Sequence, residues 1–205
     1  MPELAYLLPK VILASQSVAR KALLEELGIE VVVHPTNCDE THELNNPSEV
    51  VAMLALRKLQ AYQKEHPAYM LPVLCCDTLI SFEGKLIGKP ENRAEAKSQL
   101  LAFNAKLQEV HSGWALWYKQ SIVTGVDRAL VYFRHLDDQA IEKYLDTLEY
   151  KGAAGSYRIQ GAGQSLVDHI EGDKGTVIGL PVNQLSRTLA GTYQQYQHSW
   201  NIAGS

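Results

Sequence analysis

The sequence has few cysteines, no long apolar run and no excess of basic residues. Its three cysteines, Cys38, Cys75 and Cys76, give neither a metal-ligand spacing nor an even disulfide framework, which favours a reducing compartment. No stretch approaches the roughly 18 apolar residues of a membrane-spanning helix, and the first ten residues carry no basic leader. We therefore expect a cytoplasmic protein without a membrane partner.

Basic surface and short catalytic motifs are also missing. The formal net charge of -4 argues against nucleic acid as a partner, so the positive partners of any bound anion must be local and few. The sequence contains no HExxH, no G-x-S-x-G elbow, no Walker P-loop and no Rossmann glycine fingerprint. The seven histidines are scattered without a metal spacing. No simple local motif therefore assigns a function.

What the chain does contain is an alternation of strand-like and helix-like segments, without an internal repeat or a long linker. Apolar runs predict strands at 11–14, 31–33, 73–82, 108–117 and 128–133. Apolar residues at helical spacing predict helices at 19–27, 48–63, 93–101 and 138–145. The pattern predicts a single α/β domain over residues 1–205, a mixed twisted sheet flanked by helices, with a loose tail over 190–205.

The junction of the first strand and helix, residues 15–21, reads Ser-Gln-Ser-Val-Ala-Arg-Lys. Ser17 can cap the helix, and the free N–H groups of a helix start, together with Ser15, form a natural anion site. Arg20 and Lys21 put two cations where the helix dipole favours acidic side chains. One interpretation is that they bind an anion; the other is that Ser17 is only a cap and both cations point into water.

Two charged residues interrupt apolar segments. Lys58 continues the apolar stripe of the second helix, so it faces inward and needs a carboxylate, a phosphate or an escape to solvent. Asp77 ends the apolar run Val-Leu-Cys-Cys-Asp, and ligands of open α/β sheets gather at the carboxyl ends of strands. Asp77 could hold a divalent ion or take a proton from water. The alternative is that it caps a tight turn.

Three further polar residues are candidates. Lys89 lies between Gly88 and Pro90, which can fix the place of its ammonium group; a solvated surface lysine is the alternative. Glu40 is one of several acids in Cys-Asp-Glu-Thr-His-Glu, and spacing does not single it out. Gln160 carries a primary amide, whose donor and acceptor suit a nucleobase edge. These residues together predict a polyanion site built from Ser, Arg, Lys and one strand-end Asp.

Eight short motifs occur in the order found in Maf proteins: LASQS-ARKALLEELG, DE, LALRK, CDTLI, GKP, FRHL, GSYRIQG and GLPV. From about Val11 to Leu189 the chain resembles the Maf nucleotide pyrophosphatase family. The resemblance implies a mixed α/β fold with two lobes around a cleft, often dimeric. It also implies cleavage of a nucleoside triphosphate to the monophosphate and pyrophosphate, dependent on Mg²⁺ or another divalent cation. Family substrates include dTTP, UTP and, in one branch, 7-methyl-GTP.

The resemblance also implies the residues of the site. The phosphate-binding loop comprises Ser15, Ser17 and Arg20. The other polar positions of the cleft are Glu40, Lys58, Asp77, Lys89 and Gln160. In this interpretation Asp77 is the general base or a metal ligand, and Glu40 is a second metal ligand. Arg20, Lys58 and Lys89 neutralise the leaving pyrophosphate, and Gln160 reads the base.

The chain departs from the family at several positions. Where the family has Ser-Pro-Arg-Arg, residues 17–20 are Ser-Val-Ala-Arg, so one arginine is missing. Residues 105–108 are Ala-Lys-Leu-Gln where the family has Gly-Arg-x-His, and Ala153 replaces a lysine of the KAG members. A positioned cation stabilises the charge that develops on the phosphates during cleavage, so a protein without this arginine could bind a nucleotide and fail to hydrolyse it. The alternative function is therefore a non-catalytic nucleotide-binding regulator linked to septum formation. Lys21 or Lys106 could replace the lost charge.

Different motifs resemble family branches that act on different substrates. The segment AAGSYR resembles the CAGSFK of the 7-methyl-GTP branch, whereas CDT and IQG resemble the dTTP/UTP branch. The sequence therefore predicts a pyrophosphatase acting on dTTP, UTP or a modified nucleotide such as 7-methyl-GTP, without choosing among them.

Overall fold

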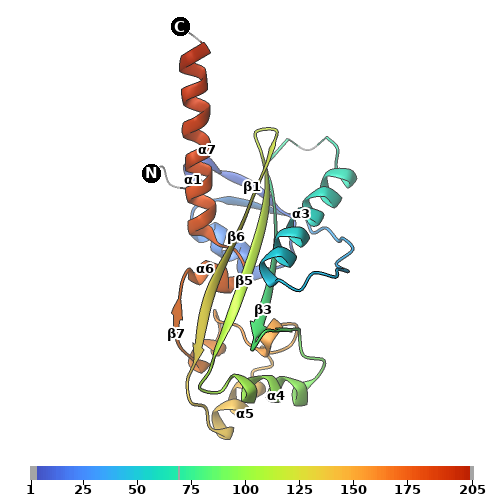
Figure 1. Ribbon diagram of the computed structural model, residues 1–205, viewed down its shortest axis with the longest axis vertical. Coiled ribbons are helices and arrows are strands. Elements are labelled where there is room, and N and C mark those ends of the chain that lie inside the picture. Colours follow the sequence, from blue (N-terminus) through green and yellow to red (C-terminus); the bar gives the residue numbers. More distant parts are fainter. Residues whose placement is uncertain (1–3, 69, 204–205) are drawn as a thin grey trace.

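The computed structural model describes the backbone of residues 4–68 and 70–203, and the side chains of these residues as far as 193. A seven-stranded sheet runs through its centre in the order β2-β1-β3-β5-β6-β7, with β4 paired to β3 (Figure 1). Its strands are β1 (Lys10–Leu13), β2 (Glu30–Val33), β3 (Val73–Phe82), β4 (Lys85–Ile87), β5 (Leu107–Tyr118), β6 (Ser121–Phe133) and β7 (Val167–Glu171). β1 is parallel to β2 and β3, and the other pairs are antiparallel. The predicted mixed sheet is confirmed.

Helices cover both faces and one end of this sheet (Figure 1). They are α1 (Leu4–Leu7), α2 (Val18–Glu26), α3 (Pro47–Glu65), α4 (Arg93–Phe103), α5 (Asp138–Asp146), α6 (Lys174–Ile178) and α7 (Val182–Ala203), with short 3₁₀ helices η1 (Ala154–Ser156) and η2 (Ala162–Leu166). Among the residues described, none of these helices is both long and apolar enough to cross a bilayer.

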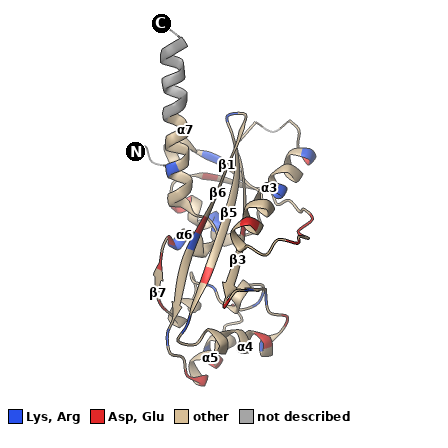
Figure 2. Ribbon diagram, viewed as in Figure 1, with Lys and Arg blue, Asp and Glu red and all other residues tan. Residues whose placement is uncertain are grey.

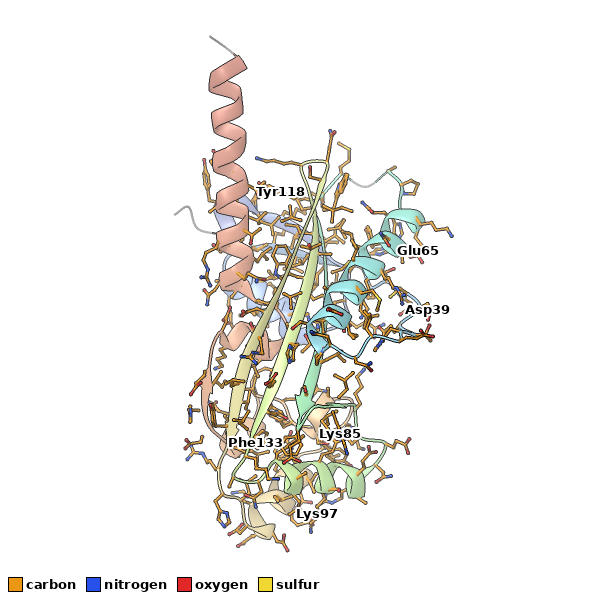
Figure 3. All side chains as sticks on the ribbon, in the orientation of Figure 1. Asp39, Glu65, Lys85, Lys97, Tyr118 and Phe133 are labelled. Carbon is orange, nitrogen blue, oxygen red and sulfur yellow. The ribbon has the colours of Figure 1, made fainter. Side chains whose placement is uncertain are left out.

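The buried residues form separate clusters at the two ends of the sheet. One cluster joins β3, β5 and β6 to α4 and α5 through residues such as Phe82, Phe103 and Ile141. At the other end, α1, α2 and α7 pack on one face and α3 on the opposite face. Tyr118 and Phe133 lie near opposite ends of the long β5–β6 hairpin (Figure 3). This division corresponds to the two lobes that the resemblance implies, and long strands run through both.

Two elements differ from the sequence prediction. β6 begins at Ser121, well before the predicted residue 128, because pairing with β5 extends through Tyr118↔Ser121 although this part of β6 is exposed and lacks an apolar pattern. Of the tail expected over residues 190–205, Ala190 is instead buried, and the backbone is helical as part of α7 through Ala203. Residues 204–205 lie outside the described residues.

Candidate active site

The candidate site lies where one edge of β3 is free. β1 pairs with β3 only at Val73 and Leu74, and β4 pairs with it only from Ile80 to Phe82. Residues 75–79 are therefore paired with β5 on one side and open on the other. Ligands of open α/β sheets bind where neighbouring strands part in this way. The prediction that Asp77 ends a strand is thus wrong: it lies in the middle of β3, within the stretch whose edge is open.

Alternation along β3 sends successive side chains to opposite faces of the sheet. Asp77 contacts Lys58 of α3 on one face. Thr78 contacts Ser112 of β5 and Arg20 of α2 on the other face. The open edge is therefore shared by two groups of polar side chains, an acid–lysine group and an arginine group.

The acid–lysine group consists of Lys58, Asp77 and Glu40. Lys58 Nζ lies 2.5 Å from Asp77 Oδ1 and 2.9 Å from Glu40 Oε1. The Lys58 and Asp77 side chains are 15% and 11% exposed, whereas that of Glu40 is 60% exposed. Figure 2 shows acidic residues along the loop before α3, from which Glu40 approaches. Of the alternatives for Lys58, the inward orientation toward a carboxylate is confirmed, and Asp77 does not cap a turn.

Two opposing effects act on the ammonium group of Lys58. Burial disfavours the charged form, but the attraction and hydrogen bond of Asp77, with those of Glu40, outweigh it, and the pKa of Lys58 is raised. Within the described part of the chain no three His, Cys, Asp or Glu side chains gather as a metal cluster. Asp77 and Glu40 nevertheless both present a carboxylate oxygen to the same Lys58 ammonium group. Mg²⁺ often takes only one or two protein carboxylates together with substrate phosphates.

The arginine group is centred on Arg20. Its Nε donates to Gly179 O at 2.8 Å, Nη1 donates to Ser15 Oγ at 3.1 Å and to Cys76 O at 3.2 Å, and Nη2 donates to Thr78 Oγ1 at 3.0 Å. All these acceptors are neutral, and no ion pair joins Arg20 to an acid among the described residues. The guanidinium is thus fixed in place while its positive charge remains uncompensated.

The start of α2 had two interpretations, an anion site or a simple helix cap with both cations in water. The contacts of Ser17, Arg20 and Lys21 distinguish between them. Ser17 is the N-cap, and its Oγ accepts a hydrogen bond from Arg20 N at 3.3 Å. Lys21 Nζ pairs with Glu25 Oε1 at 2.7 Å one turn along the helix surface. Arg20 therefore turns into the fold, while Lys21 behaves as the surface cation of the alternative interpretation.

A cavity of about 250 Å³ opens between the lobes beside this arginine. Its lining includes Ser17, Ala19, Arg20, Thr78, Lys89, Tyr157, Arg158 and Gln160. It thus brings together Ser17, Arg20, Lys89 and Gln160 of the predicted set. Ser15, Glu40, Lys58 and Asp77 do not line it. Ser15 is joined to it through its hydrogen bond with Arg20, whereas Asp77 points to the other face of β3, where it contacts Lys58.

The loop that carries Lys89 is held by the opposite side of the cavity. Gly155 N, in η1, donates to Gly88 O at 3.2 Å, and Gln99 Nε2 of α4 also reaches this carbonyl. The position of Lys89 therefore depends on contacts with η1 and α4 as well as on its glycine and proline neighbours.

A second cavity is larger, about 660 Å³, and lies away from these residues. It is bounded by the β3–β4 turn and by residues 105–107. Lys106 lines it and pairs with Glu83 at 2.8 Å, so Lys106 does not replace the missing arginine in the smaller cavity. We assign the site to the smaller cavity because its cations converge there, whereas Lys106, which lines the larger cavity, is paired with Glu83.

Sequence reasoning missed several residues of the site. Thr78 and Gly179 lay inside quoted motifs, but nothing in the sequence indicated that both would hold Arg20. Gly179 adopts φ = +111°, and a Cβ there would press on Arg20, so glycine is required at this contact. Arg158 next to the predicted Gln160 was also missed, since an arginine in a loop is unremarkable by itself.

The chain matches the family model described as Maf-like protein over residues 10–192. The chain belongs to the Maf family. A Maf relative from Bacillus thuringiensis subsp. konkukian, named dTTP/UTP pyrophosphatase, is 40% identical over 181 residues, which are 88% of this chain and 94% of the relative. A dTTP/UTP pyrophosphatase of Bacillus anthracis is 39% identical over the same shares. The resemblance predicted from the eight motifs is confirmed.

Among solved structures, a nucleoside-triphosphatase / dITP/XTP pyrophosphatase from Mycobacterium abscessus is 15% identical, with a TM-score of 0.36. The overlap covers 60% of this chain and 74% of that chain.

Proposed function

We propose that this Maf protein hydrolyses a nucleoside triphosphate to the nucleoside monophosphate and pyrophosphate. The observation that carries the proposal is a cavity whose charged lining is cationic (Arg20, Lys89 and Arg158). The carboxylate of Asp77 lies at the same open edge of β3, next in the chain to Thr78 of the cavity wall. Cations suit the phosphates of such a substrate, and a carboxylate suits activation of water. The names of the two Bacillus relatives support the same reaction.

In this proposal water attacks the α-phosphorus of the bound nucleotide. Asp77 takes a proton from the water as the new oxygen–phosphorus bond forms, and the bond to the bridging oxygen of the β-phosphate breaks. Arg20 and Lys89 stabilise the charge that moves onto the leaving pyrophosphate. Gln160, on the wall of the same cavity, offers its amide donor and acceptor to the base.

We assign Lys58 a positioning role rather than the pyrophosphate contact expected from the resemblance. Its ammonium group is already engaged by Asp77 and Glu40, and it does not line the cavity. A single cation between the two carboxylates reduces their mutual repulsion and keeps both in one place.

Mg²⁺ is part of the proposal as cofactor. Asp77 and Glu40 fit the modest set of carboxylate ligands that this ion takes when phosphates supply the rest. The bound ion would neutralise phosphate charge and polarise the phosphorus. We further propose a cytoplasmic location, no nucleic-acid partner, and a homodimer as an assembly that the family allows.

The test is incubation of the purified protein with dTTP, UTP, CTP, GTP and 7-methyl-GTP, with Mg²⁺ or with EDTA. Pyrophosphate and monophosphate are quantified separately from inorganic phosphate. We expect Mg²⁺-dependent pyrophosphate release from one or two of these nucleotides, and none with EDTA. Release of inorganic phosphate in place of pyrophosphate would contradict the proposed bond cleavage.

The alternative, a non-catalytic nucleotide-binding regulator, rests on Ala19. This residue lines the cavity at the position where the family has an arginine, so the cavity lacks one cation on the α2 side. The altered segment 105–108 no longer supports the alternative, because Lys106 lines the other cavity and Gln108 is buried in the core. Tight nucleotide binding without release of pyrophosphate would favour the regulator.

A further inference from the structure

The nucleotide cavity holds a cation that none of the predictions used. Arg158 lies between η1 and η2 and lines the cavity together with Arg20 and Lys89. No acidic side chain is among the described residues that line it, although the protein as a whole carries a formal charge of -4. A cluster of one sign inside a cleft of an oppositely charged protein concentrates ions of the opposite sign. The cavity is therefore an anion site in which Arg158 takes part.

Arg158 is held in the same manner as Arg20. Its Nε donates to Glu149 O at 3.0 Å and its Nη2 donates to Lys151 O at 2.9 Å. Both acceptors are backbone carbonyls, and no carboxylate in the described part of the chain forms an ion pair with Arg158. A guanidinium fixed by neutral acceptors keeps its full charge and loses little entropy when it meets an anion.

The backbone at Arg158 is also closely packed. A Cβ on Gly163 would lie 2.5 Å from Arg158 O and 2.9 Å from Arg158 N, so only glycine fits against it. Arg158 N further donates to Tyr144 Oη at 3.2 Å. The residue is thus a fixed part of the cavity wall rather than a loop side chain that happens to be near it.

The α2 side of the cavity lacks the arginine that the family has at the position of Ala19. Ala19 lines the same cavity, and its methyl group offers no charge. The two basic residues considered as replacements are engaged elsewhere, Lys21 with Glu25 and Lys106 with Glu83. Arg158 lines the same cavity as Ala19 and already contributes a positive charge to it in this structure.

We propose that Arg158 binds the phosphates of the nucleotide and supplies the positive charge that Ala19 lacks. This inference rests on the proposed function, since it requires a polyphosphate in the cavity. Arg158 is then a substrate-binding residue that acts from the wall opposite α2, so the phosphates lie between Arg20 and Arg158.

The experiment measures binding by calorimetry with three probes: inorganic tripolyphosphate, a UTP analogue with a methylene bridge between its α- and β-phosphates, and UMP. Arg158→Gln removes the charge, and Arg158→Lys keeps it. Arg128→Gln is the matched control, since Arg128 is exposed, pairs with Glu109 and does not line the cavity. For Arg158→Gln we expect affinity for tripolyphosphate and the UTP analogue to fall about ten- to a hundredfold, as for loss of a charged hydrogen-bonding partner.

The other variants test the charge argument. In Arg158→Gln, the affinity for UMP should fall much less than the affinity for the UTP analogue, because UMP presents fewer phosphate charges. Arg158→Lys should lose less affinity than Arg158→Gln, because it keeps the charge although it cannot hold both the Glu149 and Lys151 carbonyls. Ala19→Arg placed in the Arg158→Gln protein should restore most of what was lost. Arg128→Gln should bind all three probes as the unchanged protein does.

Two results would overturn the inference while leaving the proposed function intact. The first is unchanged triphosphate binding by Arg158→Gln. The second is an equal loss for UMP and the triphosphate, which would mean that Arg158 only holds the loop of Gln160. If the unchanged protein binds none of the three probes, the proposed function fails and the inference fails with it.

Discussion

Lys58 Nζ lies 2.5 Å from Asp77 Oδ1 while it also contacts Glu40, so one ammonium group joins a helix, a central strand and a loop. The pair connects elements that are 19 residues apart in sequence. Its position at the open edge of β3 makes the carboxylate of Asp77 both fixed and reachable. This arrangement leads to the first two predictions.

Asp77→Asn should lower pyrophosphate release by about 10²–10⁴-fold, the usual contribution of a general base. The amide has nearly the same size, and Lys58 keeps Glu40 as its partner, so the fold should persist. Steady-state release of pyrophosphate and a thermal unfolding curve of the same preparation check both statements. Unchanged turnover would remove Asp77 from the mechanism.

Lys58→Met should destabilise the protein by up to ~3 kcal/mol, because it leaves a mostly buried carboxylate without its counter-ion. The double variant Lys58→Met, Asp77→Asn should recover part of this loss, since no buried charge then remains unpaired. Because the pKa of Lys58 is raised in the folded state, the stabilisation that it provides is present below its ordinary pKa and is lost as the pH rises through the raised value. Urea unfolding of Lys58→Met, Asp77→Asn, the double variant and the unchanged protein, at neutral and at alkaline pH, measures both effects.

Arg20→Lys should weaken tripolyphosphate binding at least about tenfold with little effect on the fold. A lysine keeps the charge but cannot reach the Gly179 carbonyl and the Thr78 hydroxyl with one rigid fork. Calorimetric titration of the variant checks this expectation. Lys21→Gln is the control for loss of charge, because Lys21 pairs with Glu25 outside the cavity. Weaker binding by Lys21→Gln together with unchanged binding by Arg20→Lys would argue that only overall charge matters.

Gly113→Ala should destabilise the protein by about 1–3 kcal/mol or more. Gly113, on β5, lies against the backbone of α3, and a Cβ there would come within 3 Å of Val51 and Ala52 backbone atoms. Since α3 carries Lys58, turnover should fall as well. Gly191→Ala is the control: nothing lies within 4 Å of its added Cβ in α7, and a helical alanine gains about 0.5–1 kcal/mol over glycine. A stable Gly113→Ala protein would show that α3 can move freely off the sheet.

His111 should make the fold sensitive to mild acid. Burial lowers its pKa, helped by the charge of Arg128 and opposed by Glu109. A lowered pKa in the folded state means that the stability contributed by neutral His111 is present above about pH 6.5, the ordinary histidine value, and is lost as the pH falls toward the lowered pKa. His111→Gln, which can still bond Ser48, should flatten this part of the urea-midpoint profile. A control substitution at the exposed His135 should leave the profile as it is, and an unchanged profile in His111→Gln would refute the assignment.

The sequence by itself determined the class of fold and the family. Apolar runs such as 73–82 and helical stripes such as that of α3 are local patterns, so they fixed where strands and helices form. Because the inward position of Lys58 follows from helical periodicity, its need for a carboxylate could also be predicted. The order of short motifs identified the Maf family, since each motif is weak but their succession is specific.

Only the tertiary structure decided how these residues meet. The open edge of β3 depends on where β1 and β4 stop pairing, and strand pairing is a long-range property that no local pattern encodes. The same holds for the Gly179 carbonyl on Arg20, which comes from a residue 159 positions away. The same holds for Arg158: its charge is visible in the sequence, but its place in the cavity that Ala19 also lines arises only when distant segments of the chain pack together.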